Sequence, residues 1–299
     1  ARDVDMVFLA LLGFSAFFII LISLLLFVFI IRYYKTTKAN RENPPVDNVK
    51  LELAWIVLPT IVAVGIGAWG AVVYFRNTRP PEDAMNIYGI GKQWMWKFQH
   101  PTGQRENNEL HLPVNQPIRV QLASQDVIHS FYVPAFRVKQ DAVPGRFTQT
   151  WFKPVKTGEY HLFCAEYCGT DHAEMRGTVY VMEPQEYEEW LAENETDLSM
   201  AAQGRQLYME LGCSGCHVQG THPAPNLEGL FGRMVTLDNG RAVLADEQYL
   251  RDSILLPEKH LVAGYQAVMP SYQGQITEGE IFQIIEYIKS ISPEKKDEP

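Results

Sequence analysis

The chain has 299 residues, of which 46% are hydrophobic, and its 26 basic and 35 acidic side chains give a formal net charge of −9. This length allows two soluble domains of ordinary size beside a membrane anchor. The acidic balance argues against a nucleic-acid partner, because phosphate binding relies on a basic face.

Two long segments without charged residues lie in the first quarter of the chain. They cover residues 6–31 and 53–75. At about 1.5 Å per residue, each is long enough to cross a hydrocarbon core of about 30 Å. The first is also too long for the apolar core of a signal peptide. We therefore predict a transmembrane helical hairpin within residues 1–77.

Basic residues between the two segments indicate the orientation of this hairpin. The loop carries Arg32, Lys35, Lys38, Arg41 and Lys50. By the positive-inside rule this loop is cytoplasmic, so both termini and the remaining domains lie outside.

Residues 78–185 have the pattern of an all-β domain. Short runs rich in aromatic and β-branched residues recur between proline and glycine signals, at 94–98, 118–122, 128–133, 147–152, 159–163 and 178–181. This spacing predicts a small Greek-key sandwich or barrel. Residues 186–200 are acidic and helix-prone, as expected of a linker.

A short loop in this domain gathers soft metal ligands. Cys164 and Cys168 are followed by His172 and Met175, and soft thiolates select copper. Two thiolates on one loop can bridge two copper ions, each of which needs an imidazole, and His129 is the best second histidine. A zinc site, a Cys164–Cys168 disulfide and a single blue-copper ion are the alternatives.

Residues 201–292 have helical character, with helix-like patterns at 201–211, 246–256 and 278–291. In the last of these, four isoleucines recur at helical spacing and give one apolar face. This part is predicted to be a small all-α domain. Residues 293–299 form a charged tail.

A CxxCH run begins this domain, formed by Cys213, Cys216 and His217. It is typical of covalent haem attachment, with two thioether links and an axial imidazole. A redox CxxC or half of a zinc site is the alternative, but no second CxxC lies nearby. The segment resembles a class I cytochrome c. That resemblance implies a methionine as the second axial ligand, with Met269 as the candidate and Met234 as the alternative.

Residues 1 to about 185 resemble cytochrome c oxidase subunit II, with its helical hairpin, cupredoxin domain and dinuclear copper centre of the A type. The resemblance implies that five side chains and the Glu166 carbonyl bind copper. The side chains are those of His129, Cys164, Cys168, His172 and Met175.

The resemblance adds three further roles. The Glu166 carboxylate would help to hold a magnesium ion shared with subunit I. Trp94 matches the tryptophan at which a soluble cytochrome c delivers electrons. Glu52 matches a glutamate near a proton path of subunit I, although a carboxylate at a helix N-terminus is also ordinary dipole complementarity.

Together these features predict a multidomain membrane protein with a two-helix hairpin, a cupredoxin-like domain and a cytochrome c domain. We expect subunit II of a caa-type haem-copper oxidase in a bacterial inner (cytoplasmic) membrane, with its domains on the periplasmic side. Electrons would pass from haem c to the copper centre and on to subunit I, which reduces oxygen to water. Subunit III, smaller subunits, an upstream electron donor and the lipid bilayer are the other expected partners.

Other classes fit less well. Quinol-oxidase subunit II lacks the copper ligands, and a nitrous oxide reductase resemblance would supply neither the two-helix anchor nor the cytochrome part. A membrane-anchored copper-delivery protein would expose labile copper and has no need for haem. Another periplasmic electron-transfer protein is the remaining alternative.

Overall fold

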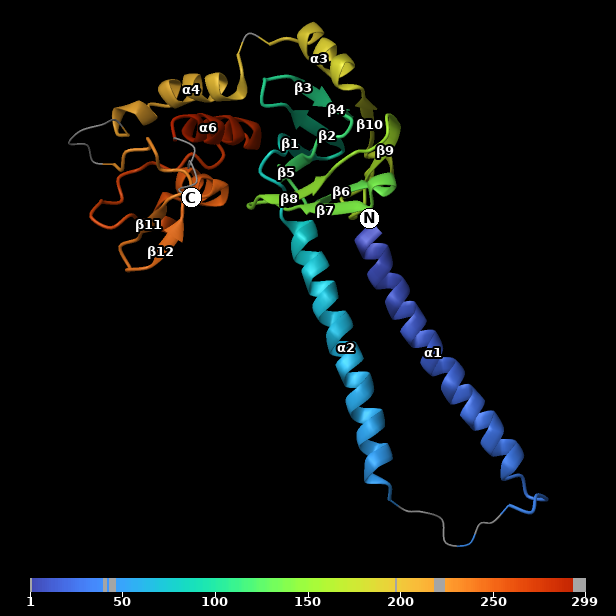
Figure 1. Ribbon diagram of the computed structural model, residues 1–299. Coiled ribbons are helices and arrows are strands. Elements are labelled where there is room, and N and C mark those ends of the chain that lie inside the picture. The colour runs from blue at the N-terminus through green and yellow to red at the C-terminus, as the bar shows by residue number, and fades with distance from the viewer. Residues whose placement is uncertain (1, 40–41, 43–46, 197, 218–223, 293–299) are drawn as a thin grey trace. The chain divides into compact units, whose positions relative to one another are not determined.

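The computed structural model describes residues 2–39, 42, 47–196, 198–217 and 224–292. The chain forms two compact units, residues 1–79 and 80–299 (Figure 1). The expected tail at residues 293–299 and Arg41 of the basic loop lie outside the described residues.

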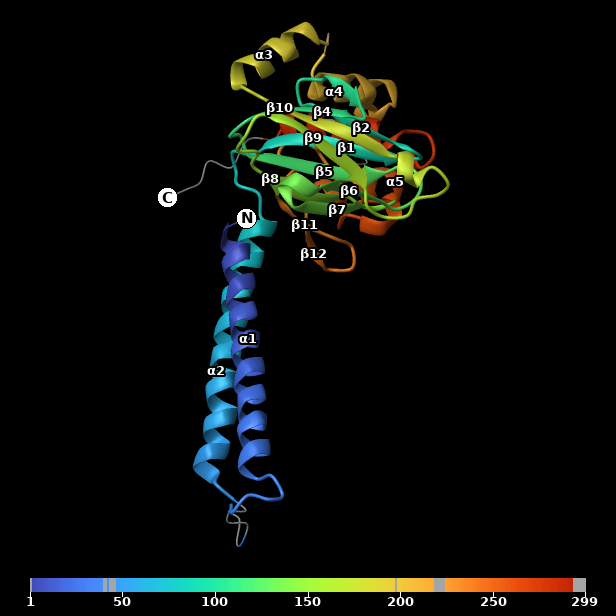
Figure 2. The ribbon, with the colours of Figure 1, turned by 90° about the vertical axis from the view of Figure 1, so that its right-hand side faces the viewer.

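The first unit consists of two long helices, α1 (Arg2–Arg32) and α2 (Val49–Thr78) (Figure 2). Both are apolar and long enough to cross a membrane, with mean hydropathies of 3.1 and 2.2 over their best windows. Each extends beyond the predicted uncharged run, since flanking polar residues continue the helix. The Asn48 side chain caps α2 by accepting from the Leu51 amide at 3.1 Å.

The first part of the second unit is a sandwich of two five-stranded sheets. Their strand orders are β3-β2-β1-β5-β8 and β4-β10-β9-β6-β7. The strands are β1 (Met85–Lys92), β2 (Met95–Gln99), β3 (Arg105–Asn107), β4 (Glu109–Pro113), β5 (Ile118–Ser124), β6 (His129–Val133), β7 (Val138–Ala142), β8 (Thr148–Phe152), β9 (Gly158–Cys164) and β10 (Arg176–Met182).

The six predicted strand runs are confirmed, and the fold class with them. Strand β1 was not predicted, because Gly89 and Gly91 weaken its β-propensity signal. Strand β7 was not predicted either, since its sequence Val-Lys-Gln-Asp-Ala is mostly polar.

Aromatic and aliphatic side chains fill the space between the two sheets. Trp96, Phe98, Leu110, Leu122 and Phe131 are at most 2% exposed. Burial of one such side chain contributes about 1.5–3 kcal/mol. The resulting rigid core supports the loops at one end of the sandwich, where the predicted copper ligands lie.

Helix α3 (Pro184–Glu193) crosses the expected boundary between the β domain and the linker. Tyr187 of this helix is buried and its hydroxyl lies 2.9 Å from Nδ1 of His100. The Trp190 ring stacks on His111. The first half of the expected linker is therefore packed on the sandwich.

Over the described residues 198–217 and 224–292, the remaining part is mainly helical, with one small β-hairpin. Its elements are α4 (Met200–Glu210), η3 (Cys213–Gly215), β11 (Met234–Thr236), β12 (Ala242–Leu244), α5 (Glu247–Leu255), η4 (Pro257–His260) and α6 (Glu278–Ser290). The sandwich adds two further single turns, η1 (Pro134–Phe136) and η2 (His172–Glu174).

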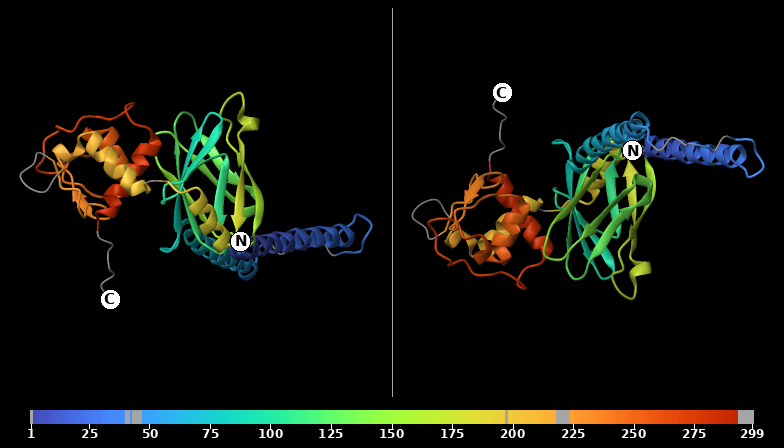
Figure 3. Two further views of the ribbon diagram at one scale, coloured as in Figure 1. Left: turned by 90° about the horizontal axis from the view of Figure 1, so that it is seen from above. Right: turned by 90° about the horizontal axis from the view of Figure 1, so that it is seen from below.

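Helices α4 and α6 pack against each other, as the gold and red helices in Figure 3 show, and they come into close contact at Gly204. A Cβ atom at Gly204 would lie only 1.8 Å from the carbonyl oxygen of Gln283. Only glycine allows this close approach of two backbones. The crossing places the end of α4, which leads into the CxxCH run, against α6, where the Tyr208 ring packs on Tyr287.

Candidate metal centre and haem cavity

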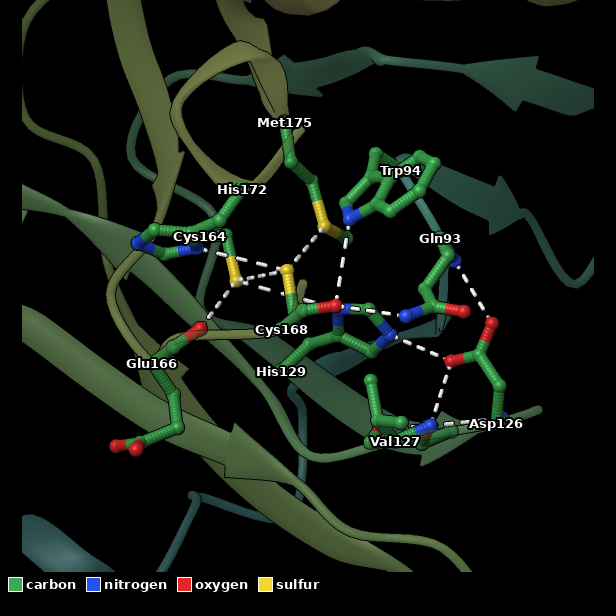
Figure 4. A network of polar contacts seen from close by, with 11 residues as sticks. Gln93, Trp94, Asp126, Val127, His129, Cys164, Glu166, Cys168, His172 and Met175 are labelled. Carbon is green, nitrogen blue, oxygen red and sulfur yellow. Dashed lines mark hydrogen bonds and ion pairs between the residues drawn. The ribbon is translucent and has the colours of Figure 1, made fainter. Parts of the chain in front are cut away.

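The predicted copper ligands of the cysteine loop come together at one end of the sandwich (Figure 4). The sulfurs of Cys164 and Cys168 lie 3.7 Å apart, well beyond the 2.05 Å of a disulfide. The Cys168 sulfur lies 3.5 Å from Nδ1 of His172 and 3.8 Å from Sδ of Met175. All four ligands occupy the loop from the end of β9 to the start of β10, with both sulfurs buried.

His129 completes the cluster from strand β6. Its Nδ1 lies 3.9 Å from the Cys164 sulfur, and the ring is fully buried. Its Nε2 lies 2.7 Å from Oδ1 of Asp126. A proton held on Nε2 by this carboxylate leaves the Nδ1 lone pair facing the sulfurs, which is the state that binds a metal.

Asp126 was missed by the sequence analysis. Its second oxygen accepts from the Gln93 amide at 2.8 Å. Burial raises the pKa of Asp126, but the bonds from Gln93 and His129 outweigh burial and lower it. The only sequence signal is an acidic residue three positions before the ligand, which is too common to be informative.

The Glu166 carbonyl, rather than its carboxylate, faces the sulfurs. The oxygen lies 3.2 Å from the Cys164 sulfur, while the side chain is exposed and points away in Figure 4. Trp94 lies on the other side, where its Nε1 donates to the Cys168 carbonyl at 3.3 Å. Gln93 donates to the same oxygen at 2.8 Å.

The two thiols differ in acidity. Burial raises the pKa of Cys164, but its hydrogen bond with His129 outweighs burial and brings the pKa to about 6. Burial, together with the neighbouring Cys164 charge, raises the pKa of Cys168 to about 12. One thiolate therefore forms readily, and the second requires a cation beside it. Two thiolates, two imidazoles, a thioether and a carbonyl form a donor set that fits copper.

The CxxCH run lies at the end of α4, beside an apolar cavity of about 600 Å³. Cys213, Cys216 and His217 all line this cavity. Nδ1 of His217 lies 2.8 Å from the Pro225 carbonyl, which fixes the ring and leaves Nε2 as the remaining ligand atom. Burial lowers the pKa of His217 and favours its neutral, metal-binding form.

Both candidate methionines line the same cavity. Met269 is partly buried and packs against the helical core, whereas Met234 is 63% exposed on β11. His260 also lines the cavity, with its Nε2 3.6 Å from Asp252. The cavity, its thiols and its methionines fit a covalently bound haem.

Glu52 lies away from these residues in the sequence, in the first turn of α2. Its position at a helix N-terminus agrees with dipole complementarity. The described residues of the first unit give no further indication of its role.

Three family models match the chain. Residues 1–71 match the transmembrane domain of cytochrome c oxidase subunit II, and residues 102–182 match its periplasmic domain. Residues 201–292 match cytochrome c.

Curated relatives point the same way. The alternative cytochrome c oxidase subunit 2 of Bradyrhizobium diazoefficiens is 35% identical over 198 residues, which cover 55% of this chain and 70% of the relative. The cytochrome c oxidase subunit 2 of Alkalihalophilus pseudofirmus is 30% identical over 287 residues, covering 89% of this chain and 81% of the relative.

Proposed function

The chain belongs to the cytochrome c oxidase subunit II family, and from this premise we propose that it relays electrons from a covalently bound haem c to a dinuclear copper centre of the A type. From there the electrons pass to subunit I of a haem-copper oxidase. The chain is an oxidoreductase subunit anchored in a membrane, with the copper domain on the periplasmic side.

The observation that carries this proposal is the sulfur pair with an imidazole on each side. Cys164 faces His129, and Cys168 faces His172. These four residues, with Met175 and the Glu166 carbonyl, would hold the dinuclear copper centre. When bound, such a pair accepts and releases one electron at a time.

Haem c would be held by thioether links to Cys213 and Cys216 and by the side chains of His217 and Met269, all of which line the cavity. A thioether ligand raises the potential of haem iron. We prefer Met269 to Met234 because it is packed against the helical core, which fixes a ligand better than an exposed strand does.

The protein's contribution is to keep the copper ligands in place and to exclude water. Cys164 and Cys168 are only 7% and 3% exposed, and His129 is held from behind by Asp126. Ligands held this rigidly change little between oxidation states, which favours fast electron transfer. Burial of the same sulfurs argues against a copper-delivery protein, which must release its metal.

Several finer roles belong to this proposal. The exposed Glu166 carboxylate would hold a magnesium ion with subunit I, Glu52 would lie near a proton path of that subunit, and Trp94 would be a point of electron input. The anchor would be a two-pass hairpin in a bacterial inner membrane, and subunit III and an upstream donor would be further partners.

Ligand substitutions test the assignment. Met269→Leu should change the haem spectrum and lower the haem potential while the copper signal stays intact, and Met234→Leu is the matched control within the same cavity.

Cys168→Ser should remove the mixed-valence copper signal in electron paramagnetic resonance and leave the haem spectrum unchanged. Crossed effects, or a Met234 variant that behaves as expected for Met269, would contradict the assignment.

A further inference from the structure

Strand β1 is buried on both of its faces. Side chains alternate along a strand, and Ile87 packs in the core between the two sheets. Tyr88 and Ile90, 1% and 7% exposed, lie in a separate cluster with Met200 of α4 and Phe282 of α6. The helical part of this unit therefore covers the outer face of β1.

On its inner face, β1 contacts a copper ligand directly. A Cβ atom at Gly91 would lie 2.7 Å from Cδ2 of His129, closer than real Cβ atoms approach, so glycine is needed here. Gly91 follows Ile90, whose side chain points to the opposite face. A single strand therefore separates the His129 imidazole from the helical part.

Helix α6 lies between strand β1 and the haem cavity. Ile284 and Ile288 line the haem cavity, whereas the Phe282 ring packs on Tyr88 with centroids 4.8 Å apart. A Cβ atom at Gly279 would lie 3.6 Å from Cδ1 of Ile90. One helix thus separates the haem cavity from β1.

Polar contacts around this cluster also join the sandwich to the helical part. Arg119 of β5 lies 3.2 Å from Glu247 of α5. Buried Arg251 donates to the Gly145 carbonyl at 2.8 Å and also pairs with Glu278. Separation would break the Arg119–Glu247 pair and the bond from Arg251 to the Gly145 carbonyl. The pair of Arg251 with Glu278 lies within the helical part and would remain. These two polar contacts add to the apolar cluster of Tyr88, Ile90, Met200 and Phe282 in holding the helical part on the sandwich.

Tyr88 adds a polar contact at the centre of this cluster, because its hydroxyl donates to the Glu286 carboxylate of α6. Burial, followed by the Glu286 charge, holds the pKa of Tyr88 well above its usual range. The tyrosine is therefore neutral and remains a hydrogen-bond donor at physiological pH.

We propose that the electron passing between the two sites crosses this contact, from α6 through Ile90 and Gly91 to His129. This inference rests on the proposed function and deepens it. Haem iron is oxidised by one electron, the copper pair is reduced by one, and no bond forms or breaks. Phe282, Tyr88, Ile90 and Gly91 act as positioning residues. The route from the fused cytochrome thus differs from input at Trp94.

The test uses the full chain carrying haem and copper, with Phe282→Ala as the main variant. We expect faster amide hydrogen exchange in β1 and α6, because the docking contact is lost. Internal electron transfer should slow about tenfold or more, equivalent to about 1.4 kcal/mol, while the optical spectra of both sites stay unchanged. Leu110→Ala, which truncates an equally buried residue on the other sheet, is the control and should leave this rate unaltered.

Ile90→Ala is a second, smaller truncation, in case the Phe282 variant does not fold, and should act in the same direction. An unchanged transfer rate in variants whose β1 exchange has risen would overturn the route. A slower internal electron transfer in the Trp94→Phe variant alone would also overturn the route. If the wild-type chain transfers no electron from haem to copper, the proposed function fails together with the route.

Discussion

Glu106 is a buried carboxylate shared by two histidines beneath helix α3. It is 8% exposed and lies 2.8 Å from Nε2 of His100, and it also accepts from the ring of His111. Burial raises the pKa of Glu106, but the bonds from these histidines outweigh burial and lower it from 4.5 to about 2. The ionised form is therefore the one that the fold stabilises.

This depressed pKa predicts a specific acid sensitivity. Because the folded value lies below the unfolded one, Glu106 stabilises the fold above pH 4.5, and this contribution is lost as the pH falls towards 2. The difference corresponds to roughly 3 kcal/mol. Glu106→Gln should lower the thermal stability at pH 7 and weaken its dependence on pH in this window.

Thermal unfolding of the wild type and the Glu106→Gln variant, followed between pH 2 and pH 7, measures how the Glu106 carboxylate contributes to stability. Glu109→Gln is the matched control, since this neighbouring carboxylate is exposed. Equal pH profiles for wild type and Glu106→Gln would show that the carboxylate contributes nothing.

The clustering of the candidate ligands could be predicted because metal chemistry restricts ligands to a few residue types at tight spacing. Cys164, Cys168, His172 and Met175 share one loop, and only His129 had to be found elsewhere. Asp126 and Gln93 escaped prediction, because an acid or an amide acquires its role only when the fold brings it against a ligand.

At the scale of elements, the crossing of α4 and α6 depends on one glycine. Helix propensity alone predicts that Gly204→Ala stabilises α4 by about 1 kcal/mol. The 1.8 Å overlap with the Gln283 carbonyl opposes this, and a backbone atom cannot move aside as a side chain can. We expect the overlap to prevail, with a net loss of about 2 kcal/mol or more.

Thermal unfolding followed at the haem absorbance measures this loss for the cytochrome part. Gln206→Ala, on the exposed face of the same helix, should change stability by no more than about 0.5 kcal/mol. A Gly204→Ala protein as stable as wild type would mean that the two helices separate without cost.

Helices α1, α2 and α6 were easier to predict than strand β1. Helices α1 and α2 are marked by uninterrupted apolar length, and α6 by an isoleucine face at helical spacing, so each signal lies within one segment. Strand β1 carries Gly89 and Gly91 because Leu122, Phe98 and His129 occupy the space of their side chains. Such spatial demands come from other elements and leave no local pattern.

For the whole molecule, the sequence predicted which domains are present but not how the cytochrome part contacts the sandwich. The contact is made by single residues spread over distant segments, such as Tyr88 and Phe282. No local spacing links them. Their role follows from the finding that both faces of β1 are buried.

The proposed electron relay requires that one chain carries haem c and a dinuclear copper centre and passes electrons from the first to the second. The most direct measurement is anaerobic one-electron photoreduction of the full chain, followed optically at both sites and by electron paramagnetic resonance. We predict transient reduction of the haem, then its reoxidation as the mixed-valence copper signal disappears in proportion. Zinc or a cystine bridge at Cys164 and Cys168, or a reduced haem that never passes its electron to copper, would rule out this relay.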